Sequence, residues 1–428
     1  MKNSNLIIAG IAISACTWTG LAQAIEEDLR LFTKDVSQLD RFGSSIAIDD
    51  GIIAVGAERS HEENIIPGSA YLFDASTGLE LAKLVASAAE KDDSNGSWSG
   101  SVYLFDATTG AQLHKLVPSD GASNDRFGSS IAIDNGIVAV GARLDDDNGT
   151  NSGSVYLFDA TTGEQLTKLL PSDGTTGDLF GASVDIHNGM VAVGAYFDWI
   201  DNVRTGSAYL FDATTGTQLA KLLPEDGAYD DRFGTSVAIG DGIIAVGSQI
   251  NDDFNFSASG SVYLFDENTK AQLHKVTPND RAIGDWFGDS IAIEHGILAV
   301  GSVSDDALGR NSGSAYLFDT STAWQVAKIV PSDGAAYDGF GSSIAINNGV
   351  VAVGARFADI ESGSAYVFSV PTQCLADLTG DGQLDFFDIS DFLRHFREEN
   401  AAVDFYNDGI FDFFDVSAFL DAFAQGCP

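Results

Sequence analysis

The chain has 428 residues, of which 44% are hydrophobic, and its 62 acidic side chains outnumber its 22 Lys and Arg for a net charge of −40. This charge argues against nucleic-acid binding, because phosphates require a basic surface, and it suits a soluble protein that meets cations, basic partners or a salty medium. The 46 Gly, few Pro and high apolar content allow one large all-β core.

Residues 1–24 have the layout of a secretory signal peptide. Lys2 precedes an apolar run from Leu6 to Ile13, and Ala22-Gln23-Ala24 precedes an acidic segment. We expect cleavage after Ala24 and a secreted or cell-surface protein without a transmembrane segment, because the run is shorter than the roughly 20 residues that span a bilayer. As an alternative, Ile13-Ser14-Ala15-Cys16 resembles a bacterial lipobox, with lipid attached at Cys16.

Residues 26–369 are degenerate copies of one unit, seen best at residues 125–163. A Phe-Gly pair recurs at Phe42, Phe127, Phe180, Phe233, Phe287 and Phe340, and a Tyr recurs at Tyr71, Tyr103, Tyr156, Tyr209, Tyr263, Tyr316 and Tyr366. Each unit contains four short apolar segments separated by turn residues, which predicts one four-stranded antiparallel sheet per repeat. A period near fifty residues indicates a propeller, solenoid or array.

The two ends of the repeat region are incomplete in matching ways. Residues 25–43 align with 164–181, so the chain begins with a fourth strand, whereas the last repeat reaches Pro371 without one. We therefore expect the N-terminal strand to complete the last blade. This closes a ring and removes two sheet edges that would otherwise promote aggregation.

One repeat is shortened. Lys83 and Tyr103 are 20 residues apart, whereas the equivalent Lys115 and Tyr156 are 41 apart, so 21 residues are missing. The missing residues are those of the first and second strands. Either a half-blade stands here or a six-bladed ring carries an extra hairpin. We favour an all-β fold of about seven blades, one of them truncated, over residues 25–370.

The repeats, with FGSSIAIDNGIVAVGA followed by SGSVYLFD, resemble FG-GAP repeats of the integrin alpha-chain type and especially their bacterial secreted relatives. The resemblance implies closure by the N-terminal strand and a ligand face built from the loops between strands 2 and 3 and between strands 4 and 1. It also implies partner binding rather than chemistry. The calcium loop common in integrin repeats is replaced by turns such as Asp134-Asn135-Gly136, so we expect no calcium on the blades.

Acidic and aromatic residues concentrate in those loops. We expect an acidic face that binds an extracellular protein or glycan. Its residues would be Trp98, Asp145, Asp146, Asp147, Trp199, Asp252, Asp253, Trp286, Asp305 and Asp306. An Asp also stands two residues before each repeat Phe, at Asp40, Asp125, Asp178, Asp231, Asp285 and Asp338. The alternative is that these acids form Asx turns and solvated loops.

The last part of the chain, residues 371–428, contains two loops with the twelve-residue spacing that wraps Ca²⁺. The first loop would use Asp377, Thr379, Asp381, the Gln383 carbonyl, Asp385 and Asp388, and the second Asp404, Asp408, the Ile410 carbonyl, Asp412 and Asp415. Cys374 and Cys427 bracket the pair and are the thiols left after signal cleavage, so we expect a disulfide.

This tandem resembles a dockerin of the variant that ends in Gly-Cys, which implies a helix after each loop. Dockerins usually carry small hydroxylated residues where this chain has Phe386-Phe387 and Phe413-Phe414. A standard cohesin partner is therefore in doubt, while a cohesin-like or surface docking partner is not. The Phe pairs would form either that docking surface or the module's own core.

Two classes of function follow. The first is a secreted or surface-held binding or adhesion protein, with the propeller presenting the ligand face and the calcium-dependent module docking or anchoring it. The second is an extracellular polysaccharide-active enzyme with its site on the propeller rim. We favour the first and do not expect an enzyme, because the sequence has no nucleophile elbow, no metal-type His cluster and no distinct carboxylate pair.

Overall fold

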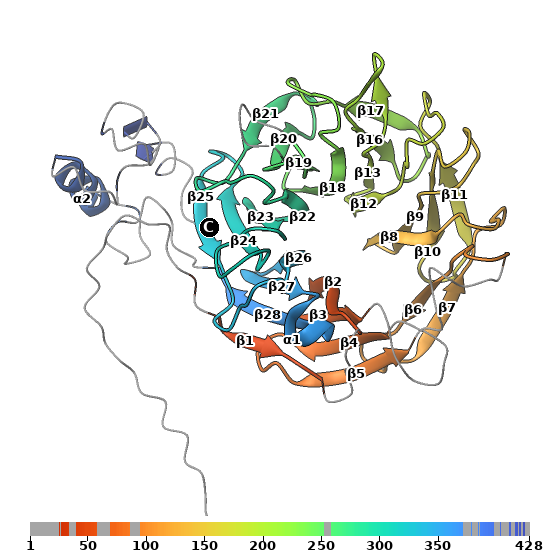
Figure 1. Ribbon diagram of the computed structural model, residues 1–428, viewed down its shortest axis with the longest axis horizontal. Helices are drawn as coiled ribbons and strands as arrows, with labels where there is room; N and C mark the ends of the chain where they lie inside the picture. Colours follow the sequence, from red (N-terminus) through yellow and green to blue (C-terminus); the bar gives the residue numbers. More distant parts are fainter. Residues whose placement is uncertain are drawn as a thin grey trace, which may run out of the picture. The chain divides into compact units, whose positions relative to one another are not determined.

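Two compact units make up the chain, and the larger, Gln23–Thr372, is an all-β propeller (Figure 1). The computed structural model describes residues 25, 27–33, 40–57, 69–85, 95–251, 258–370, 378, 384, 386–397, 403, 411, 416–417, 419–420 and 423. The expected signal peptide and Cys16 lie outside the described residues. Among those described, no helix is long and apolar enough to cross a bilayer.

Six four-stranded antiparallel sheets form the blades, with the first strand of each lying innermost in the ring. Three of them are β2 (Phe42–Asp49), β3 (Ile52–Ala57), β4 (Ser69–Asp74) and β5 (Glu80–Val85); β8 (Phe127–Asp134), β9 (Ile137–Ala142), β10 (Ser154–Asp159) and β11 (Gln165–Leu169); β12 (Ser183–His187), β13 (Met190–Ala195), β16 (Ser207–Asp212) and β17 (Gln218–Leu222). The others are β18 (Phe233–Gly240), β19 (Ile243–Ser248), β20 (Ser261–Asp266) and β21 (Gln272–Val276); β22 (Phe287–Glu294), β23 (Ile297–Ser302), β24 (Ser314–Asp319) and β25 (Gln325–Ile329); β26 (Phe340–Asn347), β27 (Val350–Ala355), β28 (Ser364–Ser369) and β1 (Leu29–Leu31).

The middle strands of a blade are buried on both faces, because each sheet packs between two neighbouring sheets. Val138, Val140, Val155 and Leu157 are fully buried, and core clusters join residues of adjacent blades. This explains why the second and third segments of the repeat are continuously apolar rather than alternating. Within each blade the repeat Phe packs edge-on against the Tyr and Phe of the third strand, with ring centroids 5.4–6.0 Å apart.

The Phe-Gly pair is the contact between blades. Gly153 bridges Phe180 of the next blade, and Gly181 has a φ of +84°. A Cβ on Gly181 would lie 2.6 Å from the Ser154 carbonyl oxygen, so only glycine permits this approach. A serine of the first strand adds a second link: Ser130 Oγ donates to the Gly181 carbonyl at 2.8 Å. The same serine bond recurs at the other junctions as Ser183 to Gly234, Ser236 to Gly288, Ser290 to Gly341 and Ser343 to Gly43.

Closure of the last blade by the N-terminal strand is confirmed. The strand β1 pairs antiparallel with β28, Leu29 opposite Val367 and Leu31 opposite Ala365. Leu31 is fully buried, and Arg30 pairs with Asp333 and Asp359. The two incomplete ends of the sequence thus form one complete sheet.

The count of seven blades is not confirmed, because six blades are four-stranded and the shortened repeat contributes a two-stranded sheet. This sheet consists of β6 (Val102–Phe105) and β7 (Gln112–Leu116). The missing 21 residues would have supplied the inner hairpin beside β2 and β8. Without it, Ile131 and Ile133 of β8 are 50% and 61% exposed, whereas Val237 and Ile239 at the equivalent positions of β18 are buried.

Three short elements complete the propeller: the hairpin strands β14 (Trp199–Ile200) and β15 (Val203–Arg204), and the helix α1 (Ala358–Glu361). In the other unit, the helix α2 (Phe386–Arg397) begins within the last three positions of the first predicted calcium loop. Phe392 of α2 is buried and stacks on Phe419 at 4.1 Å. Phe386 and Phe387 are 74% and 66% exposed, so this first Phe pair does not form the core of the unit.

We predict that Leu31→Ala destabilises the propeller by about 2–5 kcal/mol, because it leaves a cavity where the ring closes. The neighbouring Phe32→Ala is the matched control, since Phe32 is 73% exposed. Urea unfolding of both variants measures the difference. Equal effects of the two substitutions would show that the closing strand is not packed as described.

Candidate functional site

The candidate site is the loop face of the propeller, the end of the ring where the loops between strands 2 and 3 and between strands 4 and 1 emerge. The predicted acids of this face divide into buried and exposed groups. Asp145 and Asp305 are 3% and 4% exposed, whereas Asp146, Asp147 and Asp306 are exposed. Asp252 and Asp253 lie outside the described residues.

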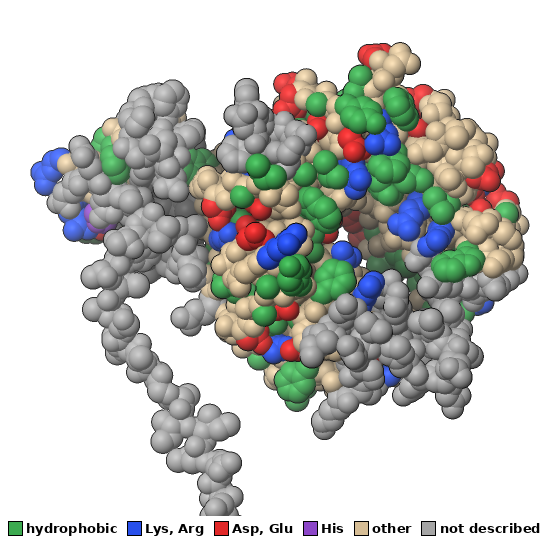
Figure 2. Space-filling model, viewed as in Figure 1, with side chains coloured by type: hydrophobic (Ala, Val, Ile, Leu, Met, Phe, Trp, Pro, Cys, Tyr) green, Lys and Arg blue, Asp and Glu red, His purple; other side chains and the backbone are tan. Residues whose placement is uncertain are grey.

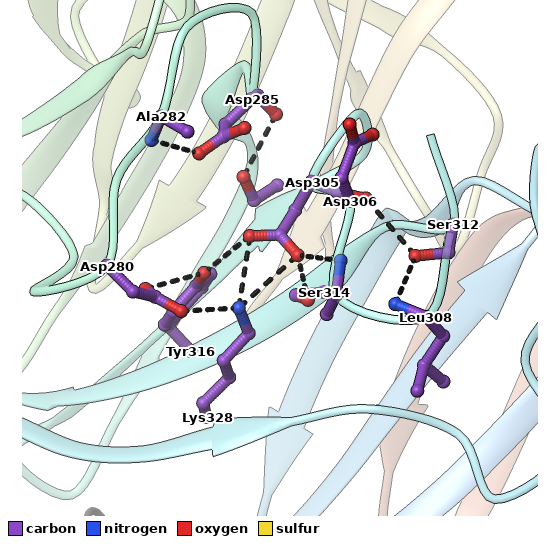
Figure 3. A network of polar contacts seen from close by, with 12 residues as sticks. Asp280, Ala282, Asp285, Asp305, Asp306, Leu308, Ser312, Ser314, Tyr316 and Lys328 are labelled. Atoms are coloured by element: carbon purple, nitrogen blue, oxygen red, sulfur yellow. Dashed lines mark hydrogen bonds and ion pairs between the residues drawn. The ribbon is translucent and has the colours of Figure 1, made fainter. Parts of the chain in front are cut away.

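The buried Asp305 is held by its own blade (Figure 3). Its carboxylate accepts hydrogen bonds from Ser314 Oγ and Tyr316 OH, both at 2.8 Å, and forms an ion pair with Lys328 at 3.1 Å. Burial raises the pKa of Asp305, but Lys328 and the two hydroxyl donors outweigh burial and lower it overall. All these partners come from the repeat, which makes Asp305 a structural residue of its blade.

The fourth-strand lysine of several blades pairs with more than one carboxylate. Lys328 also contacts Asp280 at 2.6 Å and lies over the Tyr316 ring, 5.0 Å from its centroid (Figure 3). A buried charge is tolerated only when it is paired and hydrogen-bonded in this way. The same arrangement recurs as Lys168 with Asp120, Asp145 and Asp147, and as Lys221 with Asp173 and Asp198.

In five of the six repeats, the Asp two residues before the Phe accepts the backbone N–H of the residue three positions earlier. Asp285 accepts the Ala282 N–H at 2.5 Å, and Asp125 accepts the Ala122 N–H at 2.5 Å. Burial raises the pKa of both carboxyl groups to about 6, despite these hydrogen bonds. Asp146 and Asp306 likewise accept the backbone N–H groups of Asn151 and Asn311. The turn interpretation therefore describes these acids well.

Several aromatic side chains of the face are also exposed. Trp199 in β14 is 50% exposed and Trp286 is 38% exposed, whereas Trp98 is half-buried with the Arg126 guanidinium 4.7 Å above its ring. Two further residues, Tyr229 and Tyr337, are 63% and 56% exposed. The sequence analysis missed these two tyrosines, although each replaces a smaller residue of the other repeats.

Arginines at the centre of this face were also missed. The residue before the repeat Phe, or directly after the second strand, is Arg41, Arg126, Arg143, Arg232 or Arg356 in different repeats. Because the first strands contact one another around the ring, these positions lie near its axis. Figure 2 shows Lys and Arg side chains around the centre of the ring, with hydrophobic side chains between them. The net charge of −40 is a sum over the whole chain and does not reveal this local cluster of positive charge.

A series of side-chain hydrogen bonds links two neighbouring blades at this centre. Gln249, in the amide orientation that satisfies its neighbours, donates to Asp289 at 2.6 Å and accepts from Arg232 at 3.3 Å. Burial raises the pKa of Asp289 to about 6, and the positive charge of Arg356 offsets part of that rise. Asp289 stands where other repeats have Ser, Thr or Ala. The centre of the ring therefore carries a buried carboxyl group at a position that is small and uncharged in the other repeats.

The predicted calcium ligands fall mostly outside the described residues. Only Asp388 is described, and it is fully buried in the first turn of α2. The ten other predicted ligands, and the predicted disulfide partners Cys374 and Cys427, lie outside them. Among the residues that are described, no group of three or more His, Cys, Asp and Glu is placed to hold a metal ion.

We predict that Asp285→Asn raises stability at neutral pH. The folded pKa of about 6 lies above the ordinary 3.8, so this carboxyl stabilises the fold when protonated and that contribution is lost as pH rises through 6. The variant should gain about 1–3 kcal/mol at pH 7.5 and little at pH 4. Thermal melts across this range, with the exposed Asp201→Asn as control, measure it. Similar gains in both variants would instead indicate relief of general charge repulsion.

Comparison with known proteins identifies the repeats. A family profile described as FG-GAP repeat matches residues 26–73, 111–158, 164–211, 217–265, 271–318 and 324–368, more than half of the chain. No curated protein matches. Among solved structures, the computationally designed Ika8 protein is 14% identical with a TM-score of 0.46, covering 81% of this chain and 100% of its own; we draw nothing from a likeness of this size. On the extent of the profile match, the chain belongs to the FG-GAP repeat family.

Proposed function

We propose that the chain is a secreted or cell-surface binding protein whose propeller presents its loop face to an extracellular protein or glycan. The observation that carries this proposal is the separation between repeated and variable residues. The blades repeat the same Phe, Gly, Ser, Tyr and Lys contacts, whereas the loop face holds unrepeated, exposed aromatics such as Trp199, Tyr229 and Tyr337. Exposed aromatics of this kind are typical anchors of binding interfaces.

We expect the exposed aromatics and the central arginines, rather than the acids, to be the ligand contacts. Asp145 and Asp305 are committed to serine, tyrosine and lysine partners, so they have little capacity left for a ligand. Exposed acids such as Asp146 and Asp306 lie in the loops of the same face, outside this proposed set of ligand contacts.

We predict that an array of glycans and matrix proteins yields a ligand for the purified chain, and that Trp199→Ala, Tyr229→Ala or Tyr337→Ala weakens its binding about tenfold. Leu219→Ala is the control, because Leu219 is 47% exposed but belongs to the outer strand β17. An absence of any ligand would contradict the proposal. Turnover of an arrayed polysaccharide would favour the alternative, an extracellular polysaccharide-active enzyme.

We also propose that residues 371–428 form a dockerin-like module that binds Ca²⁺ and docks the protein to a partner or to the cell surface. Two loops with calcium-ligand spacing, the helix α2 and the exposed Phe386 and Phe387 support this proposal. A Cys374–Cys427 disulfide would staple the module, and protection of both thiols from alkylation in secreted protein tests it.

We predict that this module folds only with calcium and that the propeller does not depend on it. Crowded carboxylates repel one another in empty loops, and a core of this size is too small to outweigh that repulsion. Calorimetry with and without a chelator should show one calcium-sensitive transition, which Asp377→Ala shifts. A large calcium shift of the propeller transition would place metal on the blades instead.

We further propose that β6–β7 is the remnant of a seventh blade. Gly100 bridges Phe127 as the corresponding glycines bridge the other blades, which supports this view. A copy of residues 124–144 inserted between Lys91 and Asp92 should cover Ile131 and Ile133 and raise the melting temperature. A Gly/Ser linker of equal length is the control, and an equal or lower melting temperature for the copied hairpin would count against the proposal.

A further inference from the structure

A depression of about 900 Å³ lies on the loop face between the β22–β25 blade and the blade that β1 closes. Its lining includes Trp286, Ser304, Asn311, Tyr337, Arg356 and Phe357. All of these residues belong to the propeller and are described. Three aromatic rings, two small polar side chains, one arginine and the carboxylates of Asp333, Asp338 and Asp359 therefore line one open cavity.

The aromatic lining departs from the repeat in the type of its side chains. Trp286 precedes the repeat Phe and has a φ of +57°, and Tyr337 has a φ of +73°. The same positive φ recurs before other repeat Phe residues, at Arg126 and Leu179 for example, so this backbone conformation belongs to the repeat and the departure lies in the side chain. At the Trp286 position the next repeat has Gly339, where a Cβ would lie 3.0 Å from the Phe357 ring. Glycine there leaves room for Phe357 at the cavity wall.

The acids that line the depression already have partners. Asp333 and Asp359 pair with Arg30, and Asp338 accepts the Ala335 N–H at 2.7 Å. Tyr366 OH also donates to Asp333 at 3.0 Å. Arg30 thus offsets one of the two negative charges of Asp333 and Asp359, and hydrogen bonds hold Asp333 and Asp338 from the blade side of the cavity.

Arg356 differs, because it has no ion pair within 4 Å among the residues described. Its guanidinium lies 4.8 Å from the Phe357 centroid, and the Arg41 guanidinium lies 5.3 Å from the same ring. The positive charge of Arg356 acts on the Asp289 carboxylate, which accepts a hydrogen bond from Gln249. Arg356 is therefore available to an anionic ligand.

We propose that this depression binds a carboxylate-bearing sugar unit of an acidic polysaccharide, with Trp286 and Tyr337 stacking on the sugar ring and Arg356 binding its carboxylate. The inference rests on the proposed function, which it narrows to one ligand class. The planar guanidinium can form two parallel bonds to a carboxylate. Ser304 and Asn311 supply the donors and acceptors that sugar hydroxyls need.

Calorimetric titration of the full secreted chain with an oligogalacturonate of about four units tests the proposal, and its methyl ester provides the uncharged counterpart. We expect the acid to bind and the ester to bind at least about tenfold more weakly. Arg356→Gln and Trp286→Ala should each weaken binding by at least about tenfold, and Arg356→Lys by less. Arg143→Gln is the matched control, because Arg143 holds the same repeat position on another blade.

Several results would overturn the proposal. Equal affinity for acid and ester excludes carboxylate recognition, and unchanged affinity in Arg356→Gln excludes this cavity. An Arg356-dependent response to an acidic peptide, but not to the sugar, would assign the cavity to protein ligands. If an array yields a ligand whose binding Arg356→Gln leaves intact, the proposed function stands and this inference fails. If Arg356→Gln lowers the melting temperature, the affinities of the unaltered chain for the acid and the ester decide whether a carboxylate is recognised.

Discussion

The ring depends on the close approach of neighbouring blades at the Phe-Gly pair. Phe180 fills the space beneath Tyr209 and Phe211, while Gly181 lets the backbone come near the Ser154 carbonyl of the preceding blade. Because only glycine fits this approach and its φ, the pair is fixed in each complete blade. The serine that bonds to the next glycine carbonyl adds a polar link at the same junction. Sheets that would have exposed two apolar faces thus become layers in one continuous core.

A chain with so much negative charge folds because its buried acids are paired within each repeat. One lysine of the fourth strand, such as Lys328, reaches the loop carboxylates of its own blade and the preceding connection. Tyrosine and serine hydroxyls satisfy the remaining carboxylate oxygens. Few lysines are therefore enough, and the rest of the negative charge stays on the surface, where it keeps the protein soluble.

The variable residues gather where the repeat contacts are absent. Next to the Phe-Gly junction the contacts to the preceding blade run through the backbone, as from the Trp286 N–H to the Ala258 carbonyl, so the side chain at this position can vary. The centre of that face becomes basic and aromatic although the chain is acidic. Under the proposed function, stability and recognition fall to different residues, and a change in ligand chemistry would require no change in the blades.

The sequence by itself determined the all-β class, the strands of each repeat, the closure by residues 29–31 and the site of the missing hairpin, because periodicity and glycine placement are local signals. It also offered a turn role for the loop aspartates, as the alternative to an acidic binding face. Only the tertiary structure decided that Asp145 and Asp305 are buried among partners from distant parts of the repeat. Only it brought Arg356, Trp286 and Tyr337 to one depression, since these residues are up to 70 positions apart and meet through the packing of adjacent blades. Contacts of this kind depend on how whole sheets pack, and no local pattern encodes them.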